Sequence, residues 1–454
     1  MSAWFTQIFF WLTGLHIDSV KDDNPYHKIE RNLSLNVLHG ILNIAALNMI
    51  TPFLSIFAMK LGASKIQVAL LSSAPAAIGL FAMIPGACLI DRHGHQKQLT
   101  YLFMLAHRLF FLALAAVPCF YHEIRAWLFV GLVALMNLPG AISNVAWQSY
   151  ISKIIPAEHR AEAFAARNKM MNLVGTLVTL TVGILLDHFK FLYGYQIVFA
   201  LAFVIALAEL AVFKQLDGES TKSCVAENLA NCLPEKTSFF QRFLTEMRTL
   251  LGETSFLRYT IASMIFYFAW QIAWPLFNWY QVKELGANNT WVSILNLMNT
   301  GGALFGYGYW VKMSHRHGNL KTLFYATIGI FLAPAVYAVF HNLFIIAGFN
   351  LLIGAIFSGV NLALLNVLLE VTPEKHKTTY LAYYNTAITI SAVLAPLVGI
   401  SMLKIMSFQW AFITCAIFRI IGSLSFYVNY RLELSGKSFI SKSSSFKSKI
   451  SKNL

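Results

Sequence analysis

The sequence predicts an all-α integral membrane protein with twelve transmembrane helices in two pseudo-symmetric six-helix bundles. Three observations predict this fold class. The composition is too apolar for a protein surrounded by water, the apolar residues form runs long enough to cross a bilayer, and features of the first half return in the second half. These observations specify the surrounding solvent, the number of helices and the internal symmetry.

The composition indicates that lipid is part of the protein's surroundings. Of the 454 residues, 57% are hydrophobic and only 12% are charged. Soluble domains usually contain about twice this charged fraction, and a chain this apolar cannot bury all its hydrophobic side chains in one core. The net charge of +14 would indicate nucleic-acid binding in a soluble protein, but here Lys and Arg stand in short segments beside apolar runs. We therefore expect no nucleic-acid partner.

A spanning helix needs about 20 mostly apolar residues. Twelve runs fit this requirement: 33–59, 66–90, 98–119, 126–152, 162–187, 191–214, 257–281, 290–312, 320–340, 343–369, 378–403 and 408–430. A long polar segment separates the first six from the last six. We therefore expect an interfacial N-terminal helix, a first bundle, a cytoplasmic linker, a second bundle and a basic disordered tail, at 1–31, 32–214, 215–256, 257–431 and 432–454.

The distribution of positive charge predicts the orientation. When residues near the ends of spans are counted with the adjoining segments, those on the side of the N-terminus hold 26 of the 34 Lys and Arg residues, those on the other side hold 6, and two stand near the middle of spans. Cytoplasmic loops carry an excess of Lys and Arg. We therefore expect both termini in the cytoplasm and the protein in a bacterial inner membrane.

An internal repeat connects the two halves. The segment DRHGHQKQL, from Asp91, is matched by HRHGNLKTL, from His315, in the loops after the second and eighth spans. The agreeing residues are Arg92, His93, Gly94 and Lys97 in the first loop and Arg316, His317, Gly318 and Lys321 in the second. At a constant offset, Asn144, Pro156 and Asn168 return as Asn361, Pro373 and Asn385. Matching loops at matching positions predict a duplicated six-span unit.

With these loops the sequence resembles the major facilitator superfamily of transporters. That family's signature between helices two and three is Gly, three residues, Asp, a basic residue, one residue, Gly and two basic residues. Asp91, Arg92, Gly94 and Lys97 are recognisable in it, whereas Ala87 replaces the first Gly, and His95 and Gln96 replace the basic pair. The resemblance covers residues 33–431 and implies a two-bundle transporter that works by alternating access. It also implies that the two matching loops form the inner gate, with Asp91, Arg92, Gly94, Lys97, Arg316, Gly318 and Lys321.

Polar side chains mark one face of four predicted spans. Polar groups in a bilayer are costly and face a bundle interior or a watery cavity. Helical spacing gives four such faces: Asn36, His39 and Asn43; Asn137, Asn144 and Gln148; Tyr267, Trp270, Gln271, Trp274 and Asn278; and Asn350, Gly354, Ser358 and Asn361. They belong to spans one, four, seven and ten, which line the cavity in the resembled family, and we expect them to bind substrate. The alternative is that the Asn side chains only join helices.

Ionisable residues within the spans are few. No Asp or Glu stands in the middle of spans one, four, seven or ten, and Glu209 comes late in span six. The sequence thus predicts no central carboxylate for proton coupling, and His39 is the best titratable candidate. Arg108 and Arg419 stand near the middle of spans three and twelve. They would pair with backbone carbonyls or Asn, or Arg108 would hold an anionic substrate.

The function expected from these features is secondary active transport of a small organic solute, without enzymatic activity. The alternatives are a lipid or lipid-linked molecule flippase, a multidrug efflux antiporter, and a non-transporting receptor or scaffold. The fifth span contains Gly175 and Gly183 but no proline, which departs from the pattern of drug exporters. No nucleotide-binding loop or metal cluster is recognisable. We expect a monomer without a cofactor, whose partners are the solute, membrane lipid and a coupling ion if there is one.

Overall fold

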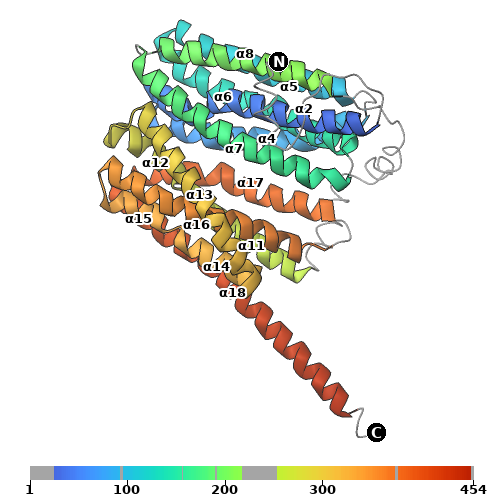
Figure 1. The fold of residues 1–454 in the computed structure, drawn as a ribbon. Helices are drawn as coiled ribbons and strands as arrows, with labels where there is room; N and C mark the ends of the chain where they lie inside the picture. Colours follow the sequence, from blue (N-terminus) through green and yellow to red (C-terminus); the bar gives the residue numbers. More distant parts are fainter. Residues whose placement is uncertain are drawn as a thin grey trace, which may run out of the picture. The chain divides into compact units, whose positions relative to one another are not determined.

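The computed structural model describes residues 25–92, 96–155, 157–189, 192–216, 253–373 and 377–450. In these ranges the regular secondary structure is helical, without strands (Figure 1). The first half contains α2 (Pro25–Asn48), α3 (Leu54–Lys60), α4 (Lys65–Arg92), α5 (Gln96–Ala116), α6 (His122–Ile154), α7 (Ala157–His188) and α8 (Tyr193–Gln215). The second half contains α11 (Thr254–Gln271), α12 (Trp274–Trp279), α13 (Asn289–His317), α14 (Asn319–Gly329), α15 (Leu332–Val339), α16 (Leu343–Val371), α17 (Lys377–Met402) and α18 (Phe408–Ile450). The all-α prediction is confirmed.

Eleven segments of the described chain are long and apolar enough to cross a membrane. The remaining predicted span, 290–312, lies within α13, which has 29 residues but carries several Asn, Gly and His residues. Large apolar side chains such as Phe81, Leu177 and Phe305 are exposed on these helices, as contact with lipid requires. The prediction of an integral membrane protein with twelve helices is therefore confirmed in its architecture, with α13 the most polar member.

Prolines interrupt three of the predicted spans. Pro52 lies in a short 3₁₀ helix between α2 and α3, and Pro275 and Pro334 lie in the first turns of α12 and α15. Proline lacks a backbone N–H, so it ends the hydrogen-bond ladder of the preceding helix. The first and seventh spans, which occupy the same place in the two halves, are both broken in this way. Interrupted helices at corresponding positions are typical of repeated transporter folds.

Two compact units make up the chain. Unit 1 is Met1–Thr237 with Gln281–Leu297, and unit 2 is Ser238–Tyr280 with Met298–Leu454. In unit 1, α2 packs against α7 and α8, and α5 packs against α6 and α8. In unit 2, α11 packs against α17 and α18, and α14 packs against α16 and α18. The same pairing order in both units fits two pseudo-symmetric bundles, while the domain boundaries expected from the sequence stay predictions.

The start of α13 is held in unit 1 by a carboxylate at the end of α7. Asp187 accepts hydrogen bonds from the backbone N–H groups of Asn289, at 3.1 Å, and Thr290, at 2.7 Å. Tyr195 donates to Asn289 Oδ1 at 2.6 Å. The first N–H groups of a helix have no partner within it, so an acidic side chain there supplies acceptors and a favourable charge. This contact accounts for the segment 281–297 in unit 1.

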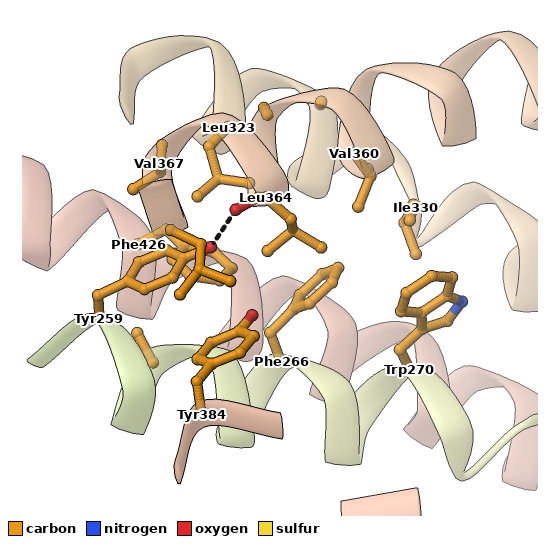
Figure 2. Close-up of a cluster of buried hydrophobic side chains, with 14 of the residues drawn as sticks. Tyr259, Phe266, Trp270, Leu323, Ile330, Val360, Leu364, Val367, Tyr384 and Phe426 are labelled. Carbon is orange, nitrogen blue, oxygen red and sulfur yellow. Dashed lines mark hydrogen bonds between the residues drawn. The ribbon is translucent and has the colours of Figure 1, made fainter. Parts of the chain in front are cut away.

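The core of unit 2 is rich in aromatic rings. Figure 2 shows Tyr259, Phe266 and Trp270 of α11 directed toward neighbouring helices. The Tyr259 hydroxyl donates to the Leu364 carbonyl oxygen at 2.7 Å, and the rings of Tyr259 and Tyr384 stack with centroids 5.7 Å apart. The buried hydroxyl is thus satisfied, and the rings bury a large apolar area. These contacts join α11 to α16 and α17.

Glycines bring α13 and α16 into close contact. A Cβ atom on Gly302 would lie 1.8 Å from the Leu351 carbonyl oxygen, and one on Gly354 would lie 1.9 Å from that of Asn299. Small residues allow helix backbones to approach closely in a bilayer, where packing rather than water drives association. Gly354, expected from the sequence on a substrate-binding face, therefore packs against another helix.

The last helix continues beyond the membrane span. The apolar part of α18 ends near Leu432, and the helix runs on to Ile450. The helix thus extends into the segment 432–454, and the disorder expected for that segment stays a prediction. Extending an existing helix is far easier than nucleating a new one, and the segment has no proline to stop it. The interfacial helix expected at 1–31 lies outside the described residues as far as position 24.

Candidate functional site

Glu209 of α8 lies at the centre of a polar cluster inside unit 1. Its side chain is 0% exposed. Arg108 Nη2 on α5 lies 2.9 Å from Glu209 Oε2 and 3.0 Å from Oε1, and Asn43 Nδ2 on α2 donates to Oε1 at 2.9 Å. Glu209 stands on the sixth span, so the expectation that no carboxylate occupies the middle of spans one, four, seven or ten stays a prediction. Glu209 is retained there because a guanidinium and an amide from other helices satisfy it.

His39 extends this cluster toward α7. Its Nδ1 atom lies 3.2 Å from Arg167 Nη1, and its Nε2 atom lies 3.3 Å from Glu209 Oε1. An arginine N–H can only donate, so Nδ1 must accept and the ring proton must be on Nε2, facing the carboxylate. In this tautomer His39 is uncharged and lies between Arg167 and Glu209, although its Nε2 atom makes no hydrogen bond to the described residues.

Arg167 completes the cluster. Its Nη1 atom donates to the backbone oxygen of Asn36 at 2.5 Å and to Asn36 Oδ1 at 3.0 Å. Its Cζ atom lies 4.2 Å from the centroid of the Trp147 ring on α6, a cation–π distance. A Cβ on Gly40 would come within 2.9 Å of the Arg167 side chain, so the guanidinium lies against the backbone of α2. We call this set the unit 1 polar cluster; it comprises Asn36, His39, Asn43, Arg108, Trp147, Arg167 and Glu209.

The structure therefore brings together the three residues of the first predicted substrate face, Asn36, His39 and Asn43. Their partners are buried side chains inside unit 1. The second face, on α6, is arranged differently. Asn137 is half-buried and donates to the Val133 carbonyl of its own helix at 3.2 Å. Asn144 and Gln148 are exposed, and Gln148 Nε2 donates to Asn144 Oδ1 at 3.4 Å. The structure therefore places buried polar groups on α2 and exposed ones on α6.

The third predicted face, on α11 and α12, is divided between core and surface. Trp270 is buried, with its ring centroid 4.7 Å from that of Phe357. Trp274 is 47% exposed, while the remaining members of this face, Tyr267, Gln271 and Asn278, are half-buried. The Trp274 ring lies edge-on to that of Trp270, with centroids 6.4 Å apart, so the pair reaches from the core to the surface across the helix break.

The fourth predicted face, on α16, is satisfied mainly by its own helix. Asn350 donates to the Ile346 carbonyl at 2.9 Å, and the buried Ser358 donates to the Ala355 carbonyl at 2.8 Å. Asn361 is exposed. Asn144 and Asn361, which correspond in the internal repeat, are thus both exposed polar residues on apolar spans.

Arg419 of α18 is buried in unit 2 against backbone rather than a carboxylate. It donates to the Trp270 carbonyl at 2.9 Å and to the Ile330 carbonyl at 3.0 Å. These carbonyls lie at the end of α11 and between α14 and α15. Arg419 thus pairs with backbone oxygens, which is one of the two arrangements expected for the arginines within spans. Arg108 instead pairs with the Glu209 carboxylate.

The residues expected in the inner gate are only partly described. Gly94 lies outside the described residues, as do the side chains of Asp91 and Arg92 at the end of α4. Lys97 donates to the backbone oxygens of Lys214, at 2.8 Å, and Leu216, at 2.6 Å. It thereby neutralises the C-terminal end of α8, where helix carbonyls lack partners.

In the matching loop of unit 2, Gly318 joins α13 to α14. The neighbouring Arg316 is exposed, and Lys321 Nζ lies 6.0 Å from the Tyr325 ring centroid. Asn319, the next residue, bonds to Ser314 and Glu370. Gly318 has φ = 80° and ψ = 160°, a conformation that other residues rarely adopt. The glycine is thus required by the turn itself.

Replacing Gly318 with valine is expected to lower the free energy of unfolding by about 1–3 kcal/mol, because a β-branched residue is strained at this φ. Gly308→Val is the matched control, since Gly308 lies inside α13 and a Cβ atom there would meet no other atom within 4 Å. Unfolding of both variants in detergent would be compared with the wild type. Equal losses in the two variants would contradict the assignment of backbone strain to Gly318.

Among the described residues, no group of three or more His, Cys, Asp or Glu side chains is placed to hold a metal ion. The unit 1 polar cluster instead combines guanidinium groups, an imidazole, amides and one carboxylate. Such groups can bind charged or hydrogen-bonding solutes and can exchange partners with one another.

The fold and these polar groups define an integral membrane protein of the transporter class, built from two units of apolar helices. The sequence matches the Major Facilitator Superfamily over residues 37–249 and 259–452. The chain belongs to this superfamily, and the resemblance found in its loops is confirmed. No curated protein sequence matches the chain.

Several solved structures share the fold. A variant of the nucleoside transporter NupG superposes with a TM-score of 0.65 at 10% identity, covering 87% of this chain and 100% of that one. A bacterial homologue of the iron transporter ferroportin, in an inward-facing state, gives 0.66 at 13% identity, covering 88% and 98%. A bacterial homologue of the human lysosomal transporter Spinster, inward-facing and occupied, gives 0.63 at 14% identity, covering 90% and 98%. At these identities the similarity establishes the fold alone.

Proposed function

We propose that this protein is a secondary active transporter that moves a small organic solute across the membrane by alternating access. The observation that carries the proposal is the exposure of Asn144 on α6 and Asn361 on α16, at equivalent positions of the repeat. An amide on a membrane span that faced hydrocarbon would be costly, so both side chains are best explained by a water-filled path. The similar structures described as inward-facing support the same type of mechanism.

We further propose that the polar and aromatic side chains of spans one, four, seven and ten contribute to solute recognition, and that the loops at Asp91–Lys97 and His315–Lys321 act in the inner gate. The contact of Lys97 with the C-terminal end of α8 supports a role for the first loop in holding neighbouring helix ends together. The turn at Gly318 supports an equivalent role for the second.

The test is uptake into proteoliposomes that contain the purified protein. Radiolabelled nucleosides, sugars, amino acids and organic acids would be supplied outside, with and without a gradient of protons or sodium ions. Saturable accumulation of one class, absent from empty liposomes, is the expected result. Movement of a fluorescent lipid between leaflets, without uptake of any solute, would overturn the proposal in favour of a flippase.

Replacing Trp274 with alanine is expected to raise the solute concentration for half-maximal uptake by about tenfold, because an aromatic contact contributes roughly 0.5–1.5 kcal/mol beyond its buried area. Gln271→Ala should act in the same direction through a lost hydrogen bond. Trp410→Ala is the matched control, since Trp410 on α18 is 64% exposed and is expected to face lipid. If Trp410→Ala and Trp274→Ala had the same effect on uptake, Trp274 would not belong to the site.

A further inference from the structure

The charges of the unit 1 polar cluster do not balance. Among the described residues of unit 1, the buried side chains with a full charge are Arg108, Arg167 and Glu209. Glu209 is shared by Arg108, Asn43 and His39. Arg167 is hydrogen-bonded only to Asn36 and the uncharged His39 in this part of the chain. The cluster thus contains one more positive than negative charge, in a setting where an uncompensated charge is strongly unfavourable.

The Arg167 guanidinium is held in one position with donors to spare. Its hydrogen bonds to the described residues all come from Nη1, while the Trp147 ring and the backbone at Gly40 support its faces. The Nε and Nη2 groups keep N–H donors that these bonds do not use. A guanidinium held in this way, with N–H donors that these bonds do not use, is suited to bind both oxygens of an acidic group at once.

Two further donors beside Arg167 have no hydrogen-bond acceptor among the described residues. They are Asn36 Nδ2 and Trp147 Nε1, and both atoms are buried. Asn36 already contacts Arg167 through its oxygen atoms, and Trp147 lies under the guanidinium. Buried donors without acceptors lower stability by about 1–3 kcal/mol each. What this region lacks is therefore negative charge and hydrogen-bond acceptors.

We propose that Arg167, Asn36 and Trp147 bind an acidic group, a carboxylate or a phosphate, on the transported solute. This inference rests on the proposed transport function and narrows its substrate class to organic anions. Arg108, the arginine that the sequence offers for an anionic substrate, is not available for this role because its guanidinium is paired with Glu209.

The test uses the purified full-length protein in detergent and two pairs of compounds that differ in charge. Glycerol 3-phosphate is compared with glycerol, and succinate with succinamide, by calorimetric titration and by the shift in unfolding temperature. We expect saturable binding of the anion in at least one pair and none of its uncharged partner. The pair that responds identifies phosphate or carboxylate as the acidic group. Binding of neither anion, or equal binding of the uncharged partners, would overturn the inference.

Variants at position 167 then assign the binding to this residue. Arg167→Gln should weaken anion binding by about tenfold to a hundredfold, as expected for the loss of charge-assisted hydrogen bonds, and Arg167→Lys should be intermediate. Lys169→Gln removes an exposed positive charge from the same helix and should bind like the wild type. Unchanged affinity in a folded Arg167→Gln variant would contradict the site. If Arg167→Gln does not fold, the comparison of charged and uncharged compounds on the wild type still decides.

The two proposals fail in different ways. Uptake of an uncharged solute by the wild type, with no binding of anions, would overturn the anion site and leave transport standing. Arg167-dependent anion binding, with no uptake of any bound compound into proteoliposomes, would overturn transport and leave the binding site standing.

Discussion

Replacing Glu209 with glutamine is expected to lower the free energy of unfolding by about 3–5 kcal/mol, the range for breaking a buried ion pair from one side. The variant leaves the Arg108 guanidinium buried without its carboxylate. It also puts an amide of similar shape in place of the carboxylate, whose Oε1 atom lies close to both Asn43 and His39. The measurement is unfolding in mixed micelles with increasing denaturing detergent, followed by circular dichroism.

A double replacement separates the ion pair from general damage to the core. The double variant Arg108→Met with Glu209→Met removes both charges and leaves no unpaired charge behind. Its loss in the free energy of unfolding should therefore be much smaller than the sum of the losses in the two single variants. Glu284→Gln is the control, since Glu284 is an exposed carboxylate, and it should change stability by less than about 0.5 kcal/mol. Additive losses for the pair would show that Glu209 and Arg108 act independently.

Most of the fold could be predicted because a bilayer imposes strong rules on a sequence. A span needs a minimum length, and its flanking charges report orientation, so composition and spacing alone locate the helices. The helix breaks within spans are harder to predict from the sequence. Pro52 and Pro275 both interrupt helices, whereas Pro139 and Pro396 lie inside continuous helices. Whether a proline ends a helix depends on neighbours that can satisfy the freed carbonyls, and those neighbours come from elsewhere in the chain.

The candidate site could be predicted only in part, for a related reason. Spacing places Asn36, His39 and Asn43 on one helical face, and the structure brings all three to the polar cluster. Their partners were missed. Arg167 falls near the start of the predicted span 162–187 and is not on any of the four predicted substrate faces; the helix α7 already begins at Ala157. Glu209 stands near the end of a span, and only the packing of α8 against α2 and α5 turns its carboxylate inward.

Both units bury an arginine where their third and sixth helices meet. In unit 1 it is Arg108, from the third helix, and its acceptor is the side chain of Glu209 on the sixth. In unit 2 it is Arg419, from the sixth helix of that unit, and its acceptors are backbone oxygens, including that of Ile330 in the third. Ile330 lies between the end of α14 at Gly329 and the start of α15 at Leu332, and its carbonyl oxygen accepts from Arg419 as well as from the Ala333 N–H, at 3.2 Å. The interrupted helix therefore takes the place of the carboxylate.

Replacing Arg419 with methionine is accordingly expected to lower the free energy of unfolding by about 3 kcal/mol. Two charge-assisted hydrogen bonds are lost, at roughly 1.5–3 kcal/mol each, and removal of a buried charge offsets part of that loss. Because one of the two acceptors is the Trp270 carbonyl at the end of α11, the break before Trp274 should also become less ordered. Solute affinity should then fall together with stability.

Two comparisons test whether Arg419 acts through these carbonyls. Arg419→Lys keeps the charge but cannot reach two acceptors with a planar fork, so its stability and solute affinity should lie between those of the wild type and Arg419→Met. Arg431→Met removes an exposed arginine from the same helix and should leave both quantities nearly unchanged. If Arg431→Met were as destabilising as Arg419→Met, the loss of stability would reflect charge on α18 in general. The helix breaks would then be maintained by the packing of Phe277 against its aromatic neighbours.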